Sequence, residues 1–89
     1  MKISRKLKVR NALGLHARPA AAIVRLLQRT KSAVEFQYRG ETVNARSIMS
    51  LLMLAAPKNA QIEVTVSGDD AEQVLLLLAE EFEQGFGEP

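Results

Sequence analysis

The chain has 89 residues, of which 47% are hydrophobic, and this length suffices for one small domain, residues 1–89, with a single core. It contains no cysteine, which excludes disulfide bonds and thiolate metal sites. No apolar run approaches the roughly 18 residues of a membrane span, and the start has no signal-peptide core. We therefore expect a soluble cytoplasmic protein that does not associate with membranes.

The formal net charge of +2 conceals an uneven distribution along the sequence. Residues 1–46 contain eleven Lys or Arg against two Glu, whereas residues 47–89 contain one Lys against eight acidic residues. A basic half attracts acidic or phosphorylated partners, although charges segregated by chance on a solvated surface would give the same counts. Nucleic-acid binding is not expected, because no basic run is interleaved with aromatic residues.

The first half of the chain contains strand and helix patterns in turn. Residues 2–9 alternate polar and apolar side chains, which indicates a strand with one solvated face, and residues 11–15 form a glycine-containing loop. Apolar side chains at helical spacing predict a helix from residue 17 to about residue 30, with a proline in its first turn. Residues 34–38 indicate a second strand, and an Arg-Gly turn leads into a short third strand at residues 41–44.

The second half adds a short helix, a strand and a longer helix. Residues 47–54 predict the short helix, a Pro-Lys-Asn break follows, and residues 62–66 alternate as a fourth strand. Asp69 and Glu72 have the spacing of a capping box for the last helix, which Gly85 can end. The order is βαββαβα. Because four strands cannot cover their own apolar face, we expect an α+β fold with three helices on one face of a four-stranded antiparallel sheet.

His16 is the only histidine, and it stands between the expected loop and the expected helix. Imidazole is a nucleophile and an acid–base group at neutral pH. A helix that starts here directs its free backbone N–H groups and the positive end of its dipole toward an anion at the ring. Arg18 adds a guanidinium that can bind phosphate through two hydrogen bonds. The combination suits a histidine that accepts and passes on a phosphoryl group, although a single histidine is more often a structural residue.

Other chemistries fit the sequence less well. Metal binding would need further histidine or cysteine ligands, and the chain has none. No serine is placed with His16 in a hydrolase pattern, and no glycine-rich nucleotide loop indicates a kinase. We therefore expect no metal, no cofactor and no self-contained catalysis.

Two segments resemble the HPr family, the histidine phosphocarriers of the bacterial phosphotransferase system. Residues 11–20, NALGLHARPA, resemble the active-site signature of the family, and residues 43–49, VNARSIM, resemble its regulatory-serine segment. The resemblance covers nearly the whole chain and implies a single HPr domain with the open-faced β-sandwich of the family. Residues 51–54, 61–64 and 85–86 are more similar to the nitrogen-related branch of that family.

The resemblance also implies a mechanism. Enzyme I, or its nitrogen-branch counterpart, would present a phosphohistidine, and Nδ1 of His16 would attack the phosphorus in line. The phosphoryl group would then pass to an EIIA-type acceptor. Arg18 and the backbone amides of Ala17 and Arg18 would offset the charge of the transferring group. The protein would be a co-substrate of its partners, and it would not be an enzyme.

Ser47 has a structural and a regulatory interpretation. Serine is a good N-cap for a short helix and needs no further reason there. The resemblance implies in addition that an HPr kinase/phosphorylase phosphorylates Ser47, which would add nearly two negative charges to a docking face and slow transfer to His16. Arg46 would then either steady this phosphate or be solvated.

The short helix also predicts a docking surface. From residue 48 to residue 54 every side chain except Ser50 is apolar, and a two-turn helix can bury only part of its circumference. Some of these side chains must face solvent unless neighbouring loops cover them. The resemblance adds the expected partner contacts, which are Ala17, Ala21, Arg25, Ile48, Met49 and Leu52.

Two functions of different classes remain open. A phosphocarrier uses His16 and Arg18 for transfer, whereas an HPr-like regulatory protein binds its targets through phosphorylation of Ser47 without transferring a phosphoryl group. The presence of His16 favours the carrier. The sequence leaves the branch, the acceptor and the use of Ser47 open, but a carrier must present one face to successive partners, so we expect a monomer.

Overall fold

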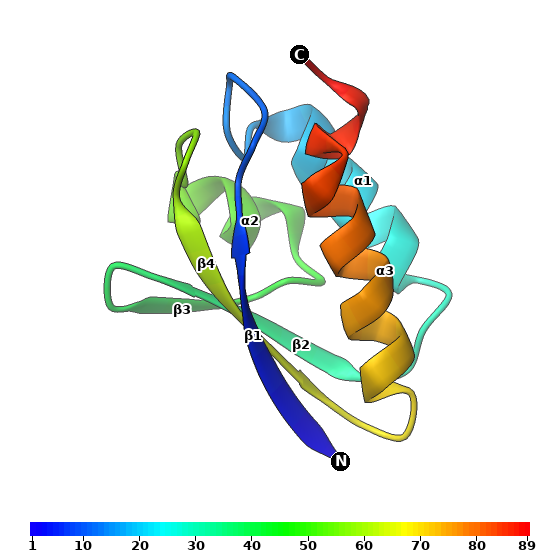
Figure 1. Cartoon of the computed structure of the whole chain (residues 1–89). Helices are drawn as coiled ribbons and strands as arrows, with labels where there is room; N and C mark the ends of the chain where they lie inside the picture. The colour runs from blue at the N-terminus through cyan, green and yellow to red at the C-terminus, as the bar shows by residue number, and fades with distance from the viewer.

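The computed structural model describes all residues from Met1 to Pro89 (Figure 1). The strands are β1 (Lys2–Lys8), β2 (Ala33–Tyr38), β3 (Glu41–Asn44) and β4 (Gln61–Ser67). The helices are α1 (Ala17–Leu27), α2 (Ile48–Leu54) and α3 (Ala71–Glu83), and a single 3-10 turn, η1 (Gly85–Gly87), follows α3. The βαββαβα order is the one predicted from the sequence. None of the helices is both long and apolar enough to cross a lipid bilayer.

The four strands form one antiparallel sheet in the order β1-β4-β2-β3. One row of paired residues, Ile3 to Val66 to Val34, points toward the helices. The next residue on each strand points the other way, where the hydroxyls of Ser4 and Thr65 share a hydrogen bond of 2.8 Å. The three helices cover only the first of these faces (Figure 1). The expected open-faced α+β sandwich is therefore confirmed.

A single hydrophobic core lies between the sheet and the helices, and 22 buried apolar residues form it. Its aromatic centre joins three parts of the chain. The Phe36 ring on β2 meets the Phe82 ring on α3 edge to face at 5.8 Å between centroids, and Phe82 meets Phe86 of η1 at 5.1 Å. Because Phe86 is buried, the residues after α3 belong to the core and are fixed against the rest of the domain.

Helix α1 ends at Leu27, three residues before the predicted end, and a tighter turn follows in which the N–H of Thr30 donates to the carbonyl of Leu27 at 3.0 Å. The Arg46 side chain reinforces this ending. Its guanidinium donates to the carbonyl oxygens of Leu27 at 2.7 Å, Thr30 at 3.2 Å and Ser32 at 2.6 Å. These bonds satisfy carbonyl oxygens at the end of α1 and in the segment after it, which have no partner within the helix. The Arg46 side chain is therefore not simply solvated, as one of the two expectations had it, because backbone carbonyls bind its guanidinium. Its role toward a phosphate on Ser47 stays a prediction.

The predicted capping box of Asp69 and Glu72 is also wrong. The N-cap of α3 is Asp70, and its side chain makes no capping bond to the helix. Its carboxylate instead accepts the backbone N–H of Lys31 at 3.0 Å, the N–H of Ser32 at 3.1 Å and the hydroxyl of Ser32. Asp70 therefore connects the start of α3 to the segment between α1 and β2, a contact across 38 positions that local spacing cannot reveal.

We predict that Asp70 makes the fold sensitive to acid. The Ser32 hydroxyl and the Lys31 amide lower the pKa of Asp70 from its ordinary value of 3.8. A carboxyl whose pKa is lower in the folded state than in the unfolded state stabilises the fold at pH values above its unfolded pKa. This contribution is lost as the pH falls through the folded pKa. The difference in unfolding free energy between wild type and Asp70→Asn should have its full size at neutral pH and should disappear as the pH falls below 3.8.

Urea unfolding over a pH series measures this difference. Asp69→Asn is the matched control, because Asp69 is exposed and accepts no side-chain hydrogen bond. A difference between wild type and Asp70→Asn that stays constant across the series would contradict the assignment.

Candidate functional site

His16 lies at the end of a tightly held loop. Its backbone has an extended conformation, φ −82° and ψ −169°, and it is the N-cap of α1. The N–H of Leu15 donates to the carbonyl of Ala56, just after α2, at 2.9 Å. Gly14 has φ +69°, and a Cβ at this position would lie 2.4 Å from the oxygen of Ala56. Only glycine allows this close approach, so Gly14 fixes the loop that presents His16.

The first turn of α1 leaves donors free beside the ring. The first helical hydrogen bond runs from the N–H of Ala20 to the carbonyl of His16 at 3.1 Å, and Pro19 has no N–H. The backbone N–H groups of Ala17 and Arg18 therefore have no partner within the helix. His16 keeps 33% of its side-chain surface exposed, and Arg18 keeps 76%. The structure thus brings together the three residues that the sequence predicted as a phosphate site.

Glu88 is a further site residue that the sequence analysis missed. Its Oε1 lies 2.8 Å from Nε2 of His16 and accepts a hydrogen bond from Nδ2 of Asn11 at 2.9 Å. Its Oε2 lies 3.9 Å from Nε of Arg18. Only 7% of the Glu88 side chain is exposed. The Glu88 carboxylate is therefore held between the His16 ring, the Arg18 guanidinium and the buried Asn11 amide.

The surroundings of Glu88 favour its ionised form. The hydrogen bond from His16 lowers the pKa of Glu88, burial opposes this effect, and the Asn11 amide and the charges of His16 and Arg18 lower the pKa further. An ionised carboxylate can only accept, so the ring nitrogen that faces it must carry the proton. No protein hydrogen bond reaches Nδ1. No group of three or more His, Asp or Glu side chains is arranged to hold a metal ion.

The residues after α3 bring Glu88 to this place. Gly85, Phe86 and Gly87 all have left-handed backbone conformations, with φ values of 60°, 57° and 75°. The two glycines adopt this conformation without steric cost. Burial of the Phe86 ring offsets the unfavourable backbone conformation of the residue between them. The main-chain oxygen of Pro89 then accepts the N–H of Ala12 at 2.9 Å. The Gly-Phe-Gly-Glu sequence was the available clue, but its distance from His16 along the chain concealed the contact.

Helix α2 exposes the apolar surface that its sequence predicted. Leu51 is fully buried, whereas Ile48 is 40%, Met49 69% and Met53 71% exposed, and Leu52 is half-buried. The helix packs against α1. The exposed side chains therefore lie on the element next to the one that begins at His16.

The N-terminus of α2 confirms the structural interpretation of Ser47. The Ser47 hydroxyl oxygen accepts the backbone N–H of Ser50 at 3.2 Å, as an N-cap does. Ser47 itself is half-buried.

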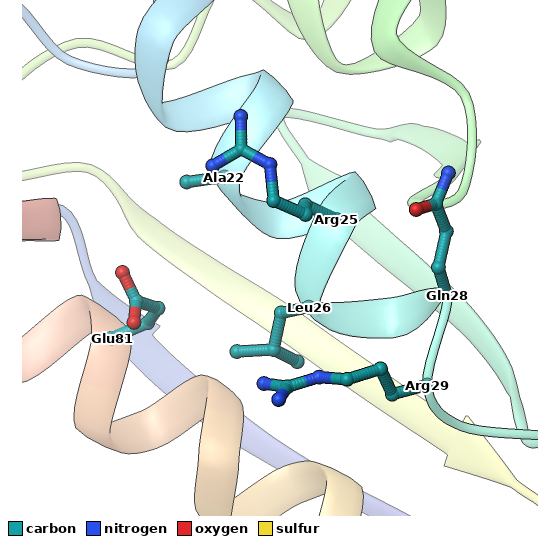
Figure 2. Close-up of a pocket in the computed structure, with 6 residues that line it drawn as sticks. All are labelled: Ala22, Arg25, Leu26, Gln28, Arg29 and Glu81. Atoms are coloured by element: carbon teal, nitrogen blue, oxygen red, sulfur yellow. The ribbon is translucent and has the colours of Figure 1, made fainter.

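The remaining predicted contact residues lie along α1. Ala17 and Arg25 are exposed and Ala21 is half-buried. Arg25 lies nine positions after His16, which is about 14 Å along a helix axis. Figure 2 shows Arg25 on α1 and Arg29 in the turn after it, beside a hollow of about 540 Å³, with Glu81 of α3 on the other side. Arg25 therefore borders a separate depression between α1 and α3 and does not belong to the group around His16.

Fold and site together define a small open-faced sandwich that presents a histidine at the N-terminus of a helix. The family model described as the phosphotransferase-system HPr component phosphorylation site matches residues 3–84. The phosphocarrier protein HPr of Chlamydia pneumoniae is 48% identical over 80 residues, covering 90% of this chain and 74% of that protein. The chain belongs to the HPr family of phosphocarrier proteins of the phosphotransferase system.

Solved structures agree with this assignment. The crystal structure of HPr from Thermoanaerobacter tengcongensis matches with a TM-score of 0.92 and 31% identity, covering 98% of each chain. A structure of an HPr dimer from the same organism matches with a TM-score of 0.77 and 33% identity, covering 92% of this chain and 94% of that one. The monomer expected from the sequence stays a prediction.

Proposed function

We propose that His16 accepts a phosphoryl group from Enzyme I, or its nitrogen-branch counterpart, and passes it to an EIIA-type acceptor. The observation that carries this proposal is the position of His16 as the N-cap of α1, beside the unpaired amides of Ala17 and Arg18. Membership in the HPr family supports it. The protein acts in the cytoplasm as a monomeric co-substrate of its partner enzymes and is not itself an enzyme.

The transfer step uses the ring nitrogen without a protein partner. The lone pair of Nδ1 forms a bond to phosphorus while the bond between phosphorus and the donor nitrogen breaks, and its electron pair stays on the donor. The amides of Ala17 and Arg18 and the positive end of α1 stabilise the charge on the phosphoryl oxygens. The largely exposed guanidinium of Arg18 has the freedom to bind those oxygens as well.

Partner proteins dock on the surface formed by α1 and α2. Its apolar part consists of Ile48, Met49 and Leu52, and Ala17 and Ala21 add small side chains along α1. Arg25 contributes positive charge at the far end of α1, which suits an acidic partner surface. The Leu15–Ala56 hydrogen bond links the loop before His16 to the end of α2, so binding on this face brings a partner close to the ring.

Phosphorylation of Ser47 by an HPr kinase/phosphorylase regulates this docking. A phosphate on Ser47 adds nearly two negative charges at the start of α2, next to Ile48 and Met49. Arg46 is occupied by the carbonyls after α1 and does not neutralise that charge. The added negative charge therefore repels an acidic partner surface.

Intact mass measurement tests the transfer function. The purified protein is mixed with phosphoenolpyruvate and an Enzyme I of either branch, and the more efficient donor identifies the branch. We expect one acid-labile phosphoryl group on the wild type and none on His16→Ala. Arg18→Ala should be labelled about 10- to 100-fold more slowly, because one charged donor to the transferring oxygens is lost. A wild type that neither donor labels, but that HPr kinase with ATP labels on Ser47, would make the protein a regulator.

Substitution of Met49 tests the docking surface. Met49→Gln should raise the KM of the donor for this protein about three- to tenfold, because a truncated interface contact costs on the order of 1 kcal/mol. Leu76→Gln is the matched control, since Leu76 is 59% exposed but lies on α3. Equal effects of the two substitutions on KM would argue against a docking role for α2.

Ser47 phosphorylation is tested by labelling the protein with HPr kinase and ATP before adding Enzyme I. We expect the initial rate of His16 labelling to fall at least about tenfold, and the loss to shrink at high salt, because it arises from charge repulsion. Ser47→Ala should lose about 1 kcal/mol of stability with its N-cap, yet its His16 labelling should not respond to the kinase. An unchanged rate after complete Ser47 phosphorylation would remove the regulatory role.

A further inference from the structure

Glu88 covers one of the two ring nitrogens of His16. Its Oε1 lies 2.8 Å from Nε2, and only 7% of the Glu88 side-chain surface is exposed to solvent. Nδ1 makes no hydrogen bond to the protein. The two nitrogens of the ring are therefore in different environments, although in a free histidine side chain both are open to reaction.

This difference fixes where the proton of the neutral ring lies. Neutral imidazole has one N–H donor and one lone pair, and a carboxylate next to one nitrogen selects the form with the proton on that nitrogen. Glu88 accepts from Nε2–H, so the lone pair is on Nδ1. The same logic orients the histidine of a Ser-His-Asp triad, where a buried carboxylate holds the proton on the ring nitrogen that does not react.

We propose that Glu88 is a positioning residue that directs phosphoryl transfer to Nδ1 of His16 by holding the proton on Nε2 and covering that nitrogen. The proposal rests on the proposed function of His16. Attack by Nδ1 forms the N–P bond while the bond between phosphorus and the donor breaks and its electron pair leaves with the donor. The proton stays on Nε2, so the ring gains positive charge as the bond forms. The Glu88 carboxylate stabilises that charge, and the electron pair returns to Nδ1 when the phosphoryl group leaves.

The rest of the site holds Glu88 in this position. Asn11 is 1% exposed, and its Nδ2 donates both to Glu88 Oε1 at 2.9 Å and to the carbonyl of Gly14 at 2.7 Å. The amide therefore ties the carboxylate to the loop that presents His16. On the other side, the buried Phe86 anchors the backbone two residues before Glu88. Such support is what a side chain needs in order to orient a neighbouring ring.

The test uses phosphoramidate, a small phosphoryl donor that needs no partner protein. Wild type, Glu88→Ala and Glu88→Gln are labelled, and nitrogen-15 and phosphorus-31 NMR identify the nitrogen that carries the phosphoryl group. Glu83→Ala is the matched control, because Glu83 is exposed on α3 and pairs with Arg10 at 3.2 Å, away from the ring.

We expect labelling on Nδ1 alone in the wild type and the control. Glu88→Ala should carry phosphoryl groups on both nitrogens and react at Nδ1 about tenfold more slowly, comparable to the roughly 10- to 100-fold effect of removing a carboxylate that supports a metal-ligating histidine. Glu88→Gln should keep the Nδ1 selectivity, because its amide oxygen still accepts from Nε2–H, but should share the slower rate because its charge is lost.

Two results would overturn the proposal. One is labelling of Glu88→Ala on Nδ1 alone at the wild-type rate. The other is faster labelling of Nδ1 in either variant, which would make Glu88 a barrier to the incoming phosphate. Because phosphoramidate acts without Enzyme I, failure of Enzyme I to label the wild type would count against the proposed function and would leave this test intact.

Discussion

The arrangement of the whole domain depends on a sheet with one apolar face. Val34, Val66 and their neighbours on the inner row must leave water, and the open face cannot take them because it carries the hydroxyls and charges of the alternate residues. All three helices are therefore required on the same side. This requirement places α1 beside α2 and leaves the N-terminus of α1 at the end of the molecule, where a partner can reach it (Figure 1).

Polar contacts then determine where α1 begins and ends. At its start, the missing Cβ of Gly14 lets the loop approach Ala56, and the His16 backbone enters the helix from a fixed direction. At its end, the Arg46 guanidinium takes the free carbonyls. A helix held at both ends has little freedom to slide or fray, so the free amides at its first turn keep a constant position. A preorganised donor set of this kind costs little reorganisation when an anion binds.

Periodicity was sufficient to predict most of the fold, because β2, β4, α1 and α3 each show one buried row and one solvated row in the local sequence. That His16, Ala17 and Arg18 lie together could be predicted from the sequence as well, since all three lie within one turn of each other. Sequence periodicity gave no information about side chains whose partners are far away along the chain. The cap of α3 was assigned to Asp69, so the contacts of Asp70 were missed. Arg46 was assigned to solvent or to a phosphate, and Glu88 was not noticed at all. Each of these charged groups has its partners 14 to 77 positions away, at distances that no local spacing encodes.

The two ends of the described chain lie at opposite ends of the molecule (Figure 1). Met1 leads into β1 far from His16, whereas the main-chain oxygen of Pro89 is bonded to Ala12 in the loop that precedes the histidine. An affinity tag, fluorophore or surface linker attached after Pro89 would therefore lie close to the proposed transfer site at His16 and would compete with a protein that docks there. Attachment before Met1 leaves that face clear, which makes it the appropriate point for immobilising the protein in binding studies.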